Sequence, residues 1–319
     1  MKKREKGMKP MAKIYSSVDE LIGKTPLLKI NTISKEHGAK ALILVKLESF
    51  NPVGSAKDRV AKNILDDAEK KGFLSKDTTI IEPTSGNTGV GLAALTAARG
   101  YKMVVVMPET MSKERQLLMK AFGAELVLTE GAKGMKGTIE KAEELNAQIP
   151  NSFIAGQFTN PANPEAHYLT TGPEIWEDTD GKVDIFVSAI GTGGTISGTG
   201  KFLKEKNPDI KIIGVEPKSS SVLSGGTAGS HKIQGIGAGF VPDVLDTKIY
   251  DEIISVTDED SYVFGKALAK KEGILAGISS GAAMCAAIKI SKREENKGKT
   301  IVVLLPDTGE RYLSAGLYE

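Results

Sequence analysis

Residues 184–195, Asp184-Ile185-Phe186-Val187-Ser188-Ala189-Ile190-Gly191-Thr192-Gly193-Gly194-Thr195, join a strand-like run to a glycine-rich loop, and the helical pattern Ser197–Lys206 follows. Apolar residues at consecutive positions are typical of a strand covered on both faces. A strand that leads through a turn into a helix is the repeating unit of a parallel sheet. This stretch therefore predicts an α/β fold.

The same alternation continues through most of the chain. Strands are predicted at 41–48, 79–81, 103–107, 125–128, 184–190, 211–215 and 301–305. Helices are predicted at 59–71, 90–99, 112–122, 135–148, 164–176, 197–206, 258–271 and 282–292. In open parallel sheets ligands bind beyond the carboxyl ends of the strands, so the loops after strands are the candidate sites.

The composition is that of a globular protein with a large core. The chain has 319 residues, 40% hydrophobic and 26% charged, which suggests one or two domains. Its formal net charge of +2 gives no case for nucleic acid or an anionic membrane as a partner. No run is long enough to span a membrane.

Cysteine and histidine usage argues against metal chemistry. The single cysteine, Cys285, lies in a run typical of a packed helix and is predicted to be an inert core thiol. The histidines, His37, His167 and His231, have no metal-ligand spacing, so no metal site is predicted. Residues 1–12 are expected to be a disordered basic extension without the apolar core of a secretion signal, which favours the cytoplasm.

One lysine stands at the start of a predicted helix. Asn51-Pro52-Val53-Gly54-Ser55-Ala56-Lys57-Asp58-Arg59 contains turn and N-cap residue types, which place Lys57 in the first helical turn. A helix N-terminus disfavours a positive charge and pushes the amine toward its neutral form, which attacks carbonyls and forms Schiff bases. The alternative is a solvated surface lysine.

Two loops have the composition of anion sites. Gly191, Thr192, Gly193, Gly194 and Thr195 supply converging backbone N–H groups and two hydroxyls ahead of a helix, which suits a phosphate. The alternative is a tight turn that needs small residues.

The second loop, Glu82–Gly89, follows the strand at 79–81 and is dense in hydroxyl and amide groups. Thr84, Ser85, Asn87 and Thr88 exceed what a simple helix N-cap requires, and they predict a carboxylate site. In Leu275–Gly281, one serine of the pair Ser279 and Ser280 is expected to cap the following helix and the other to donate to a ligand.

A rival motif is also present. Gly89-Val90-Gly91-Leu92-Ala93-Ala94 matches a loose dinucleotide-binding fingerprint, with Glu109 about twenty residues on. Five loop residues, 84–88, separate the strand from the first glycine, whereas that motif needs a tight turn. A nucleotide-binding regulatory protein is therefore the distant alternative.

A Schiff-base lysine, a phosphate site, a carboxylate site and a serine donor together describe a pyridoxal phosphate (PLP) enzyme that acts on an amino acid. Over nearly its whole length the chain resembles the cysteine synthase (O-acetylserine sulfhydrylase) family of PLP fold type II. The matching segments include 23–27, 51–59, 82–89, 107–112, 126–137, 170–180, 191–195, 232–240 and 309–314. The segments 232–240 and 309–314 are specific to the cysteine synthase branch.

The resemblance implies a role for each candidate residue. Lys57 holds PLP and moves the substrate α-proton. Gly191 to Thr195 bind its phosphate, Asn87 its phenolic oxygen and Ser279 its pyridine nitrogen. The substrate carboxylate is bound by Thr84, Ser85, Asn87, Thr88 and Gln157.

The resemblance also implies the reaction and the architecture. O-acetyl-L-serine and sulfide give L-cysteine and acetate by β-replacement through an α-aminoacrylate, with cystathionine β-synthase or O-phosphoserine sulfhydrylase as alternatives. The implied fold has two open, mostly parallel twisted sheets covered by helices, as in the tryptophan synthase β subunit. A smaller mobile domain, 47–155, would close on a larger cofactor-binding domain, 13–46 with 156–319. A homodimer and a complex with serine acetyltransferase are implied partners.

Overall fold

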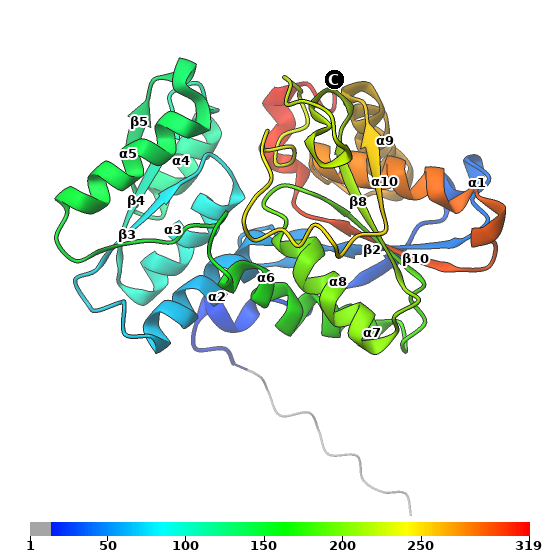
Figure 1. Cartoon of the computed structure of the whole chain (residues 1–319), viewed down its shortest axis with the longest axis horizontal. Helices are drawn as coiled ribbons and strands as arrows, with labels where there is room; N and C mark the ends of the chain where they lie inside the picture. The colour runs from blue at the N-terminus through cyan, green and yellow to red at the C-terminus, as the bar shows by residue number, and fades with distance from the viewer. Residues whose placement is uncertain (1–13) are drawn as a thin grey trace, which may run out of the picture.

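The computed structural model describes residues 14–319, which form two sheets covered by helices (Figure 1). The six-stranded sheet has the order β1 (Leu27–Lys29), β2 (Leu42–Leu47), β10 (Thr300–Leu305), β7 (Ile185–Ala189), β8 (Lys211–Pro217), β9 (Glu252–Val256). The four-stranded sheet has the order β5 (Glu125–Thr129), β4 (Lys102–Pro108), β3 (Thr79–Pro83), β6 (Ser152–Ile154). Every pairing is parallel except β1 with β2, so the α/β prediction is confirmed.

The larger sheet joins the two ends of the chain. The C-terminal strand β10 lies between β2 and β7, with Val303 opposite both Val45 and Val187. These side chains are fully buried, as expected for a strand covered on both faces. The segment after β10 therefore emerges at the same sheet edge as the loops after β2 and β7.

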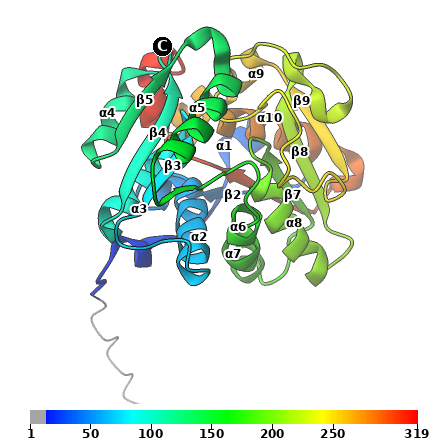
Figure 2. The same ribbon diagram turned by 60° about the vertical axis from the view of Figure 1, so that its left-hand side comes forward.

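The helices pack on both faces of the sheets (Figure 2). They are α1 (Thr32–Glu36), α2 (Lys57–Lys70), α3 (Asn87–Arg99), α4 (Lys113–Ala121), α5 (Gly134–Gln148), α6 (Ala162–Ala166), α7 (Gly172–Asp178), α8 (Gly194–Lys206), α9 (Asp258–Glu272) and α10 (Ile278–Ser291). A π-helical turn, η4 (His167–Thr171), joins α6 to α7. The 3₁₀ segments are η1 (Val18–Leu21), η2 (Glu48–Phe50), η3 (Gly131–Lys133), η5 (Lys218–Ser220), η6 (Val222–Ser224), η7 (Glu294–Asn296) and η8 (Gly309–Ala315).

Helix α10 is the central helix of the larger core. Apart from Lys289, its side chains are buried, and its apolar residues pack with β2, β7 and β10. A helix that is apolar all round must be covered all round. Cys285 lies in this helix, 1% exposed, and burial raises the pKa of its thiol to about 11, which agrees with the predicted inert thiol.

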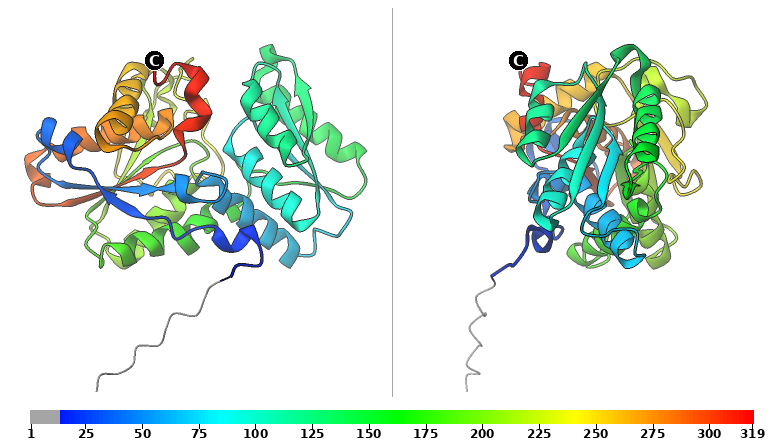
Figure 3. Two further views of the ribbon diagram at one scale, coloured as in Figure 1. Left: turned by 180° about the vertical axis from the view of Figure 1, so that it is seen from behind. Right: turned by 90° about the vertical axis from the view of Figure 1, so that its left-hand side faces the viewer.

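The two sheets form separate bodies, with the C-terminal segment η8 at their junction (Figure 3). All four strands of the smaller sheet come from residues 79–154. The domain limits 47–155, and the motion attributed to that part, stay predictions. The expected extension at 1–12 lies outside the described residues.

Some sequence predictions were wrong in detail. Strands β1, β6 and β9 were missed because none has an unbroken buried apolar run, and β1 and β6 are only three residues long. The single helix expected at 164–176 is α6, η4 and α7 in succession. Helix α10 begins at Ile278 rather than Ala282, and α3 and α8 each begin three residues earlier than predicted.

Within residues 14–319, no helix combines the length and apolar character needed to cross a membrane. In the same residues, no group of three or more histidine, cysteine or acidic side chains is arranged to hold a metal ion.

Candidate active site

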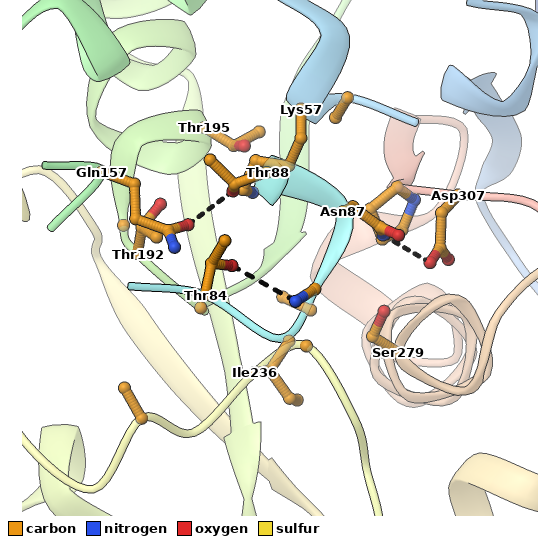
Figure 4. A pocket seen from close by; sticks show the side chains of 18 of the residues that line it. Lys57, Thr84, Asn87, Thr88, Gln157, Thr192, Thr195, Ile236, Ser279 and Asp307 are labelled. Atoms are coloured by element: carbon orange, nitrogen blue, oxygen red, sulfur yellow. Dashed lines mark hydrogen bonds between the residues drawn. The ribbon is translucent and has the colours of Figure 1, made fainter. Parts of the chain in front are cut away.

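A cavity of about 220 Å³ collects the predicted site residues (Figure 4). Its wall includes Lys57, Thr84, Ser85, Asn87, Thr88, Gln157, Gly191, Thr192, Gly193, Thr195 and Ser279. They come from the starts of α2, α3, α8 and α10 and from the segment after β6. Gly194, the first residue of α8, is the one predicted residue outside the wall, and it lies against Asn163.

The loop before α2 fixes the position of Lys57. Lys57 is the first residue of α2, and its backbone N–H donates to Ser55 Oγ at 3.2 Å. Asp58 accepts from the Val53 N–H at 2.7 Å and from the Ser55 hydroxyl at 3.1 Å. These side chains satisfy backbone groups at the helix start, as the turn residues predicted.

The pKa of the Lys57 ammonium is lowered, chiefly because burial penalises the charged form. The carboxylates of Asp307 and Glu48 act in the opposite direction. The predicted shift toward the neutral amine is therefore supported, but burial rather than the helix terminus is its main cause.

The glycine-rich loop presents unpaired donors. The backbone N–H groups from Thr192 to Ile196 have no acceptor within residues 14–319. They lie before and within the first turn of α8, where the helix dipole attracts an anion. This arrangement suits a phosphate better than a turn formed only for packing.

Two glycines in this loop are required by the structure. Gly193 has φ +86°, in the left-handed region that side chains disfavour. A Cβ at Gly191 would lie 2.3 Å from the Gly235 carbonyl oxygen, a backbone atom. The loop can therefore follow its path only with glycine at these positions.

Two residues behind the glycine-rich loop were not predicted as site residues. The buried His167 hydrogen-bonds Thr195 Oγ1 through Nε2 at 3.1 Å and Thr171 Oγ1 through Nδ1 at 2.9 Å. Burial, with Lys57 and Arg59 nearby, holds the pKa of His167 well below its usual range. Asn163 Nδ2 donates to Thr192 Oγ1 at 3.0 Å and to the Gln157 carbonyl at 2.7 Å.

The second anion site forms at the start of α3. The backbone N–H groups of Ser85, Asn87 and Thr88 have no acceptor in the described part of the chain. The Gly86 N–H donates to Thr84 Oγ1 at 3.2 Å, and Thr88 Oγ1 donates to Gln157 Oε1 at 2.5 Å (Figure 4). Backbone donors at a helix start therefore add to the side-chain donors that the sequence indicated.

A buried carboxylate, Glu82, positions the Gln157 segment. Its oxygens accept from the Gly156 N–H at 2.7 Å and the Gln157 N–H at 3.4 Å. Burial raises the pKa of Glu82 to about 7. Sequence reasoning gave Glu82 no role, although it heads the loop that was singled out.

Ser279 and Ser280 have different surroundings. Ser279 lies in the cavity wall, whereas Ser280 lies outside it and its Oγ is buried without a partner among the described residues. The expectation that one of them caps the helix was wrong: the cap residue is Gly277, and no side chain caps this end. Because α10 begins at Ile278, both serines lie inside the helix.

Four further groups, three from the segment after β10 and one from α4, lie in or beside the cavity. Asp307 and Tyr312 lie in its wall, and the Tyr312 hydroxyl donates to Asp307 Oδ2 at 2.6 Å. Arg311 donates to Asn87 Oδ1. Arg115, from α4, donates to the Ser85 carbonyl at 3.2 Å and lies 5.4 Å from the centre of the Tyr312 ring. The branch-specific segment 309–314 marked this region, but gave no role to any residue.

The rival dinucleotide motif does not form a loop. Residues Gly89–Ala94 lie inside α3 and are buried. A Cβ at Gly91 would lie 3.2 Å from the Lys57 carbonyl oxygen, so this glycine lets α3 pack closely against α2. The fingerprint requires a turn between strand and helix, and none is present there.

Comparisons relate the chain to known proteins. Residues 18–307 match the family model described as pyridoxal-phosphate dependent enzyme. A cysteine synthase from Staphylococcus aureus is 53% identical over 307 residues, covering 96% of this chain and 98% of that protein.

Solved structures give the same result. A cysteine synthase from Entamoeba histolytica aligns with TM-score 0.94 and 50% identity, covering 99% of this chain and 94% of that one. An O-acetylserine dependent cystathionine beta-synthase from Helicobacter pylori aligns with TM-score 0.91 and 40% identity, covering 97% and 100%.

Proposed function

The chain belongs to the pyridoxal-phosphate dependent enzyme family, and within it to the cysteine synthases, and we propose that Lys57 is the residue that holds PLP and moves the substrate proton. The reaction is a β-replacement that converts O-acetyl-L-serine and sulfide to L-cysteine and acetate. The observation that carries the assignment of Lys57 is its place in one cavity with two sets of N–H donors that have no acceptor among the described residues, where burial lowers the pKa of its amine.

The residues present fit PLP. Its phosphate matches the free N–H groups from Thr192 to Ile196, with the Thr195 hydroxyl beside them. When bound, the cofactor withdraws electrons from the substrate α-carbon, which makes loss of the α-proton and of the β-acetate possible. Asn87 donates to its phenolic oxygen and Ser279 to its pyridine nitrogen.

Ser279 influences the type of reaction. A carboxylate at this place would favour a protonated pyridine nitrogen and strong electron withdrawal. A neutral hydroxyl donates to an unprotonated nitrogen, so electron withdrawal is weaker. Weaker withdrawal favours expulsion of a β-leaving group over amino-group transfer.

Lys57 acts as the base. Its lowered pKa leaves a larger share of the neutral amine, whose lone pair accepts the α-proton at Nζ. The amino-acid carboxylate is bound by the free N–H groups of Ser85, Asn87 and Thr88 and by the hydroxyls of the same loop. Gln157, bonded to Thr88, completes this side.

Reductive trapping tests the assignment. Borohydride reduction of the holoenzyme followed by peptide mass spectrometry should place the cofactor mass on the peptide containing Lys57. Lys57→Ala should abolish this adduct and reduce turnover by at least about 10³-fold. Lys62→Ala is the matched control, because Lys62 lies on the same helix in a partly exposed pair with Asp66. A label on another lysine, or normal turnover by Lys57→Ala, would contradict the proposal.

A donor panel tests the substrates. Acetylated, phosphorylated and free serine are each offered with sulfide and with homocysteine. O-acetylserine with sulfide should give the highest kcat/KM. Preference for homocysteine or for the phosphorylated donor would favour the two alternative sister activities.

We propose two partners, a second copy of this chain and serine acetyltransferase. Phe50, Leu117 and Leu313 are apolar and more than half exposed, and a homodimer interface would remove such side chains from water. The carboxylate site at the start of α3 would bind the C-terminal carboxylate of serine acetyltransferase. Binding of a carboxylate there would also cause residues 47–155 to close over the cavity. We place the reaction in the cytoplasm. Light scattering tests the homodimer, with Leu117→Lys as a variant that should break it. Competition by a peptide with the C-terminal sequence of serine acetyltransferase tests the second partner.

A further inference from the structure

The side-chain amide of Asn87 is held between two groups of opposite charge from the end of the chain. Its Nδ2 donates to Asp307 Oδ2 at 2.7 Å, and its Oδ1 accepts from Arg311 Nη1. Asn87 is separated from these residues by 220 and 224 positions in sequence. Figure 4 shows Asn87 and Asp307 on the same side of the cavity, with Ser279 close by.

This arrangement fixes the orientation of the amide. An ionised carboxylate only accepts and a guanidinium only donates, so the amide nitrogen must face Asp307 and the oxygen must face Arg311. The reversed amide would lose two charge-assisted hydrogen bonds and place like partial charges together. One N–H of Nδ2 bonds Asp307, and the second has no acceptor among residues 14–319.

Asp307 and Arg311 are themselves fixed. Asp307 is 1% exposed, accepts from the Tyr312 hydroxyl, and forms a backbone bridge with Ser55 of the Lys57 loop. Its carbonyl accepts from Gly277 N at 3.3 Å, next to the start of α10. Arg311 also donates to the Val53 carbonyl. The loop of Lys57, the start of α3 and the start of α10 therefore meet at Asp307.

We propose that Asp307, with Arg311, is a positioning residue that directs the free N–H of Asn87 toward the phenolic oxygen of PLP. This inference rests on the proposed role of Asn87. Without Asp307 the amide can rotate and present its oxygen to an anionic oxygen, which turns a hydrogen bond into a repulsion. With PLP bound, the amide would lie between the Asp307 carboxylate and the phenolic oxygen and would keep these two negative groups apart.

The test uses the visible spectrum of the holoenzyme, which responds to hydrogen bonding at the phenolic oxygen. Asn87→Ala and Asp307→Asn should shift the absorption maximum and the pH titration of the band in the same direction. Each should also raise the dissociation constant for PLP about tenfold or more, as for a lost hydrogen bond to a charged group. The double variant should differ little from Asn87→Ala, because Asp307 acts through Asn87.

Two further variants serve as controls. Tyr312→Phe removes another hydrogen bond to Asp307 but leaves Asn87 in contact with it, so its spectrum should stay close to that of the parent. Arg311→Met removes the donor on the other side of the amide and should shift the band in the same direction as Asp307→Asn, which covers the case in which Asp307→Asn does not fold.

The outcomes separate this inference from the proposed function. A cofactor adduct at Lys57, a shift in Asn87→Ala and none in Asp307→Asn or Arg311→Met would overturn the positioning role alone. Fully additive shifts in the double variant would do the same. Absence of the Lys57 adduct in the parent would overturn the proposed function as well.

Discussion

His167 Nε2 lies 3.1 Å from Oγ1 of Thr195, so a buried imidazole orders a hydroxyl at the proposed phosphate site. The other ring nitrogen faces Thr171 Oγ1, and the ring is neutral because its pKa is well below the usual range. With the proton on Nε2, the ring donates to Thr195 and leaves the threonine O–H free for an anion.

We therefore expect His167→Ala to weaken PLP binding about tenfold, because the hydroxyl loses its fixed direction. The measurement is fluorescence titration of the apoprotein with PLP. Thr171→Val, which removes only the Nδ1 partner, should have a smaller effect. Unchanged affinity in His167→Ala would show that Thr195 does not need the imidazole.

Glu82 should make stability depend on pH. Burial raises its pKa from 4.5 to about 7, so the folded protein binds a proton more tightly than the unfolded chain. The contribution to stability is full below pH 4.5 and is lost as the pH rises through 7. The shift corresponds to about 3 kcal/mol between these limits.

Glu82→Gln removes this titration while keeping an acceptor for the Gly156 N–H. The difference in unfolding free energy between the two proteins should therefore change by a few kcal/mol between pH 5 and 8, with the parent relatively more stable at pH 5. Urea unfolding at four pH values in saturating PLP measures it. A constant difference across this range would contradict the assigned pKa.

Arg59 and Glu48 form a buried pair whose disruption should be costly. Arg59 Nε bonds Glu48 Oε2 at 2.7 Å, Arg59 Nη1 bonds Glu174 Oε1 at 2.6 Å, and Glu48 is fully buried. Arg59→Met leaves the Glu48 charge unpaired and should destabilise the protein by about 3–5 kcal/mol. Adding Glu48→Gln should recover part of this loss.

The matched control is an exposed pair, Lys71 with Asp67, whose atoms lie 2.7 Å apart. Lys71→Met should change the unfolding free energy by less than about 1 kcal/mol. Urea midpoints for the four proteins give the comparison. Equal losses in Arg59→Met and Lys71→Met would refute the role of burial.

Cys285 should be protected from thiol reagents. Burial raises its pKa from 9.0 to about 11, which lowers the thiolate fraction at pH 8 roughly 100-fold. Because it is the only cysteine, the rate of labelling by a disulfide reagent reports this site alone. The rate in denaturant should be at least about 100-fold faster than in the native protein, and equal rates would show that the thiol is accessible.

The sequence by itself determined the α/β class, most strands and helices, and the loops of the site. Ile185, Phe186 and Val187 in β7 are consecutive apolar residues, and Lys57, Thr88 and Gly193 stand in or beside loops of distinctive composition that lead into helices. Such signals are local, because periodicity, turn chemistry and helix starts depend on residues close in sequence. The short strand β6 gave no such signal and was missed.

Only the tertiary structure decided which distant groups meet at the cavity. Asp307 contacts Asn87 across the two sheets, His167 of η4 contacts Thr195 at the start of α8, and Glu82 contacts Gly156 because the parallel strands β3 and β6 end at the same sheet edge. The pKa of Lys57 likewise depends on burial by segments remote in sequence. Contacts of this kind follow from strand order and register, which no local pattern specifies.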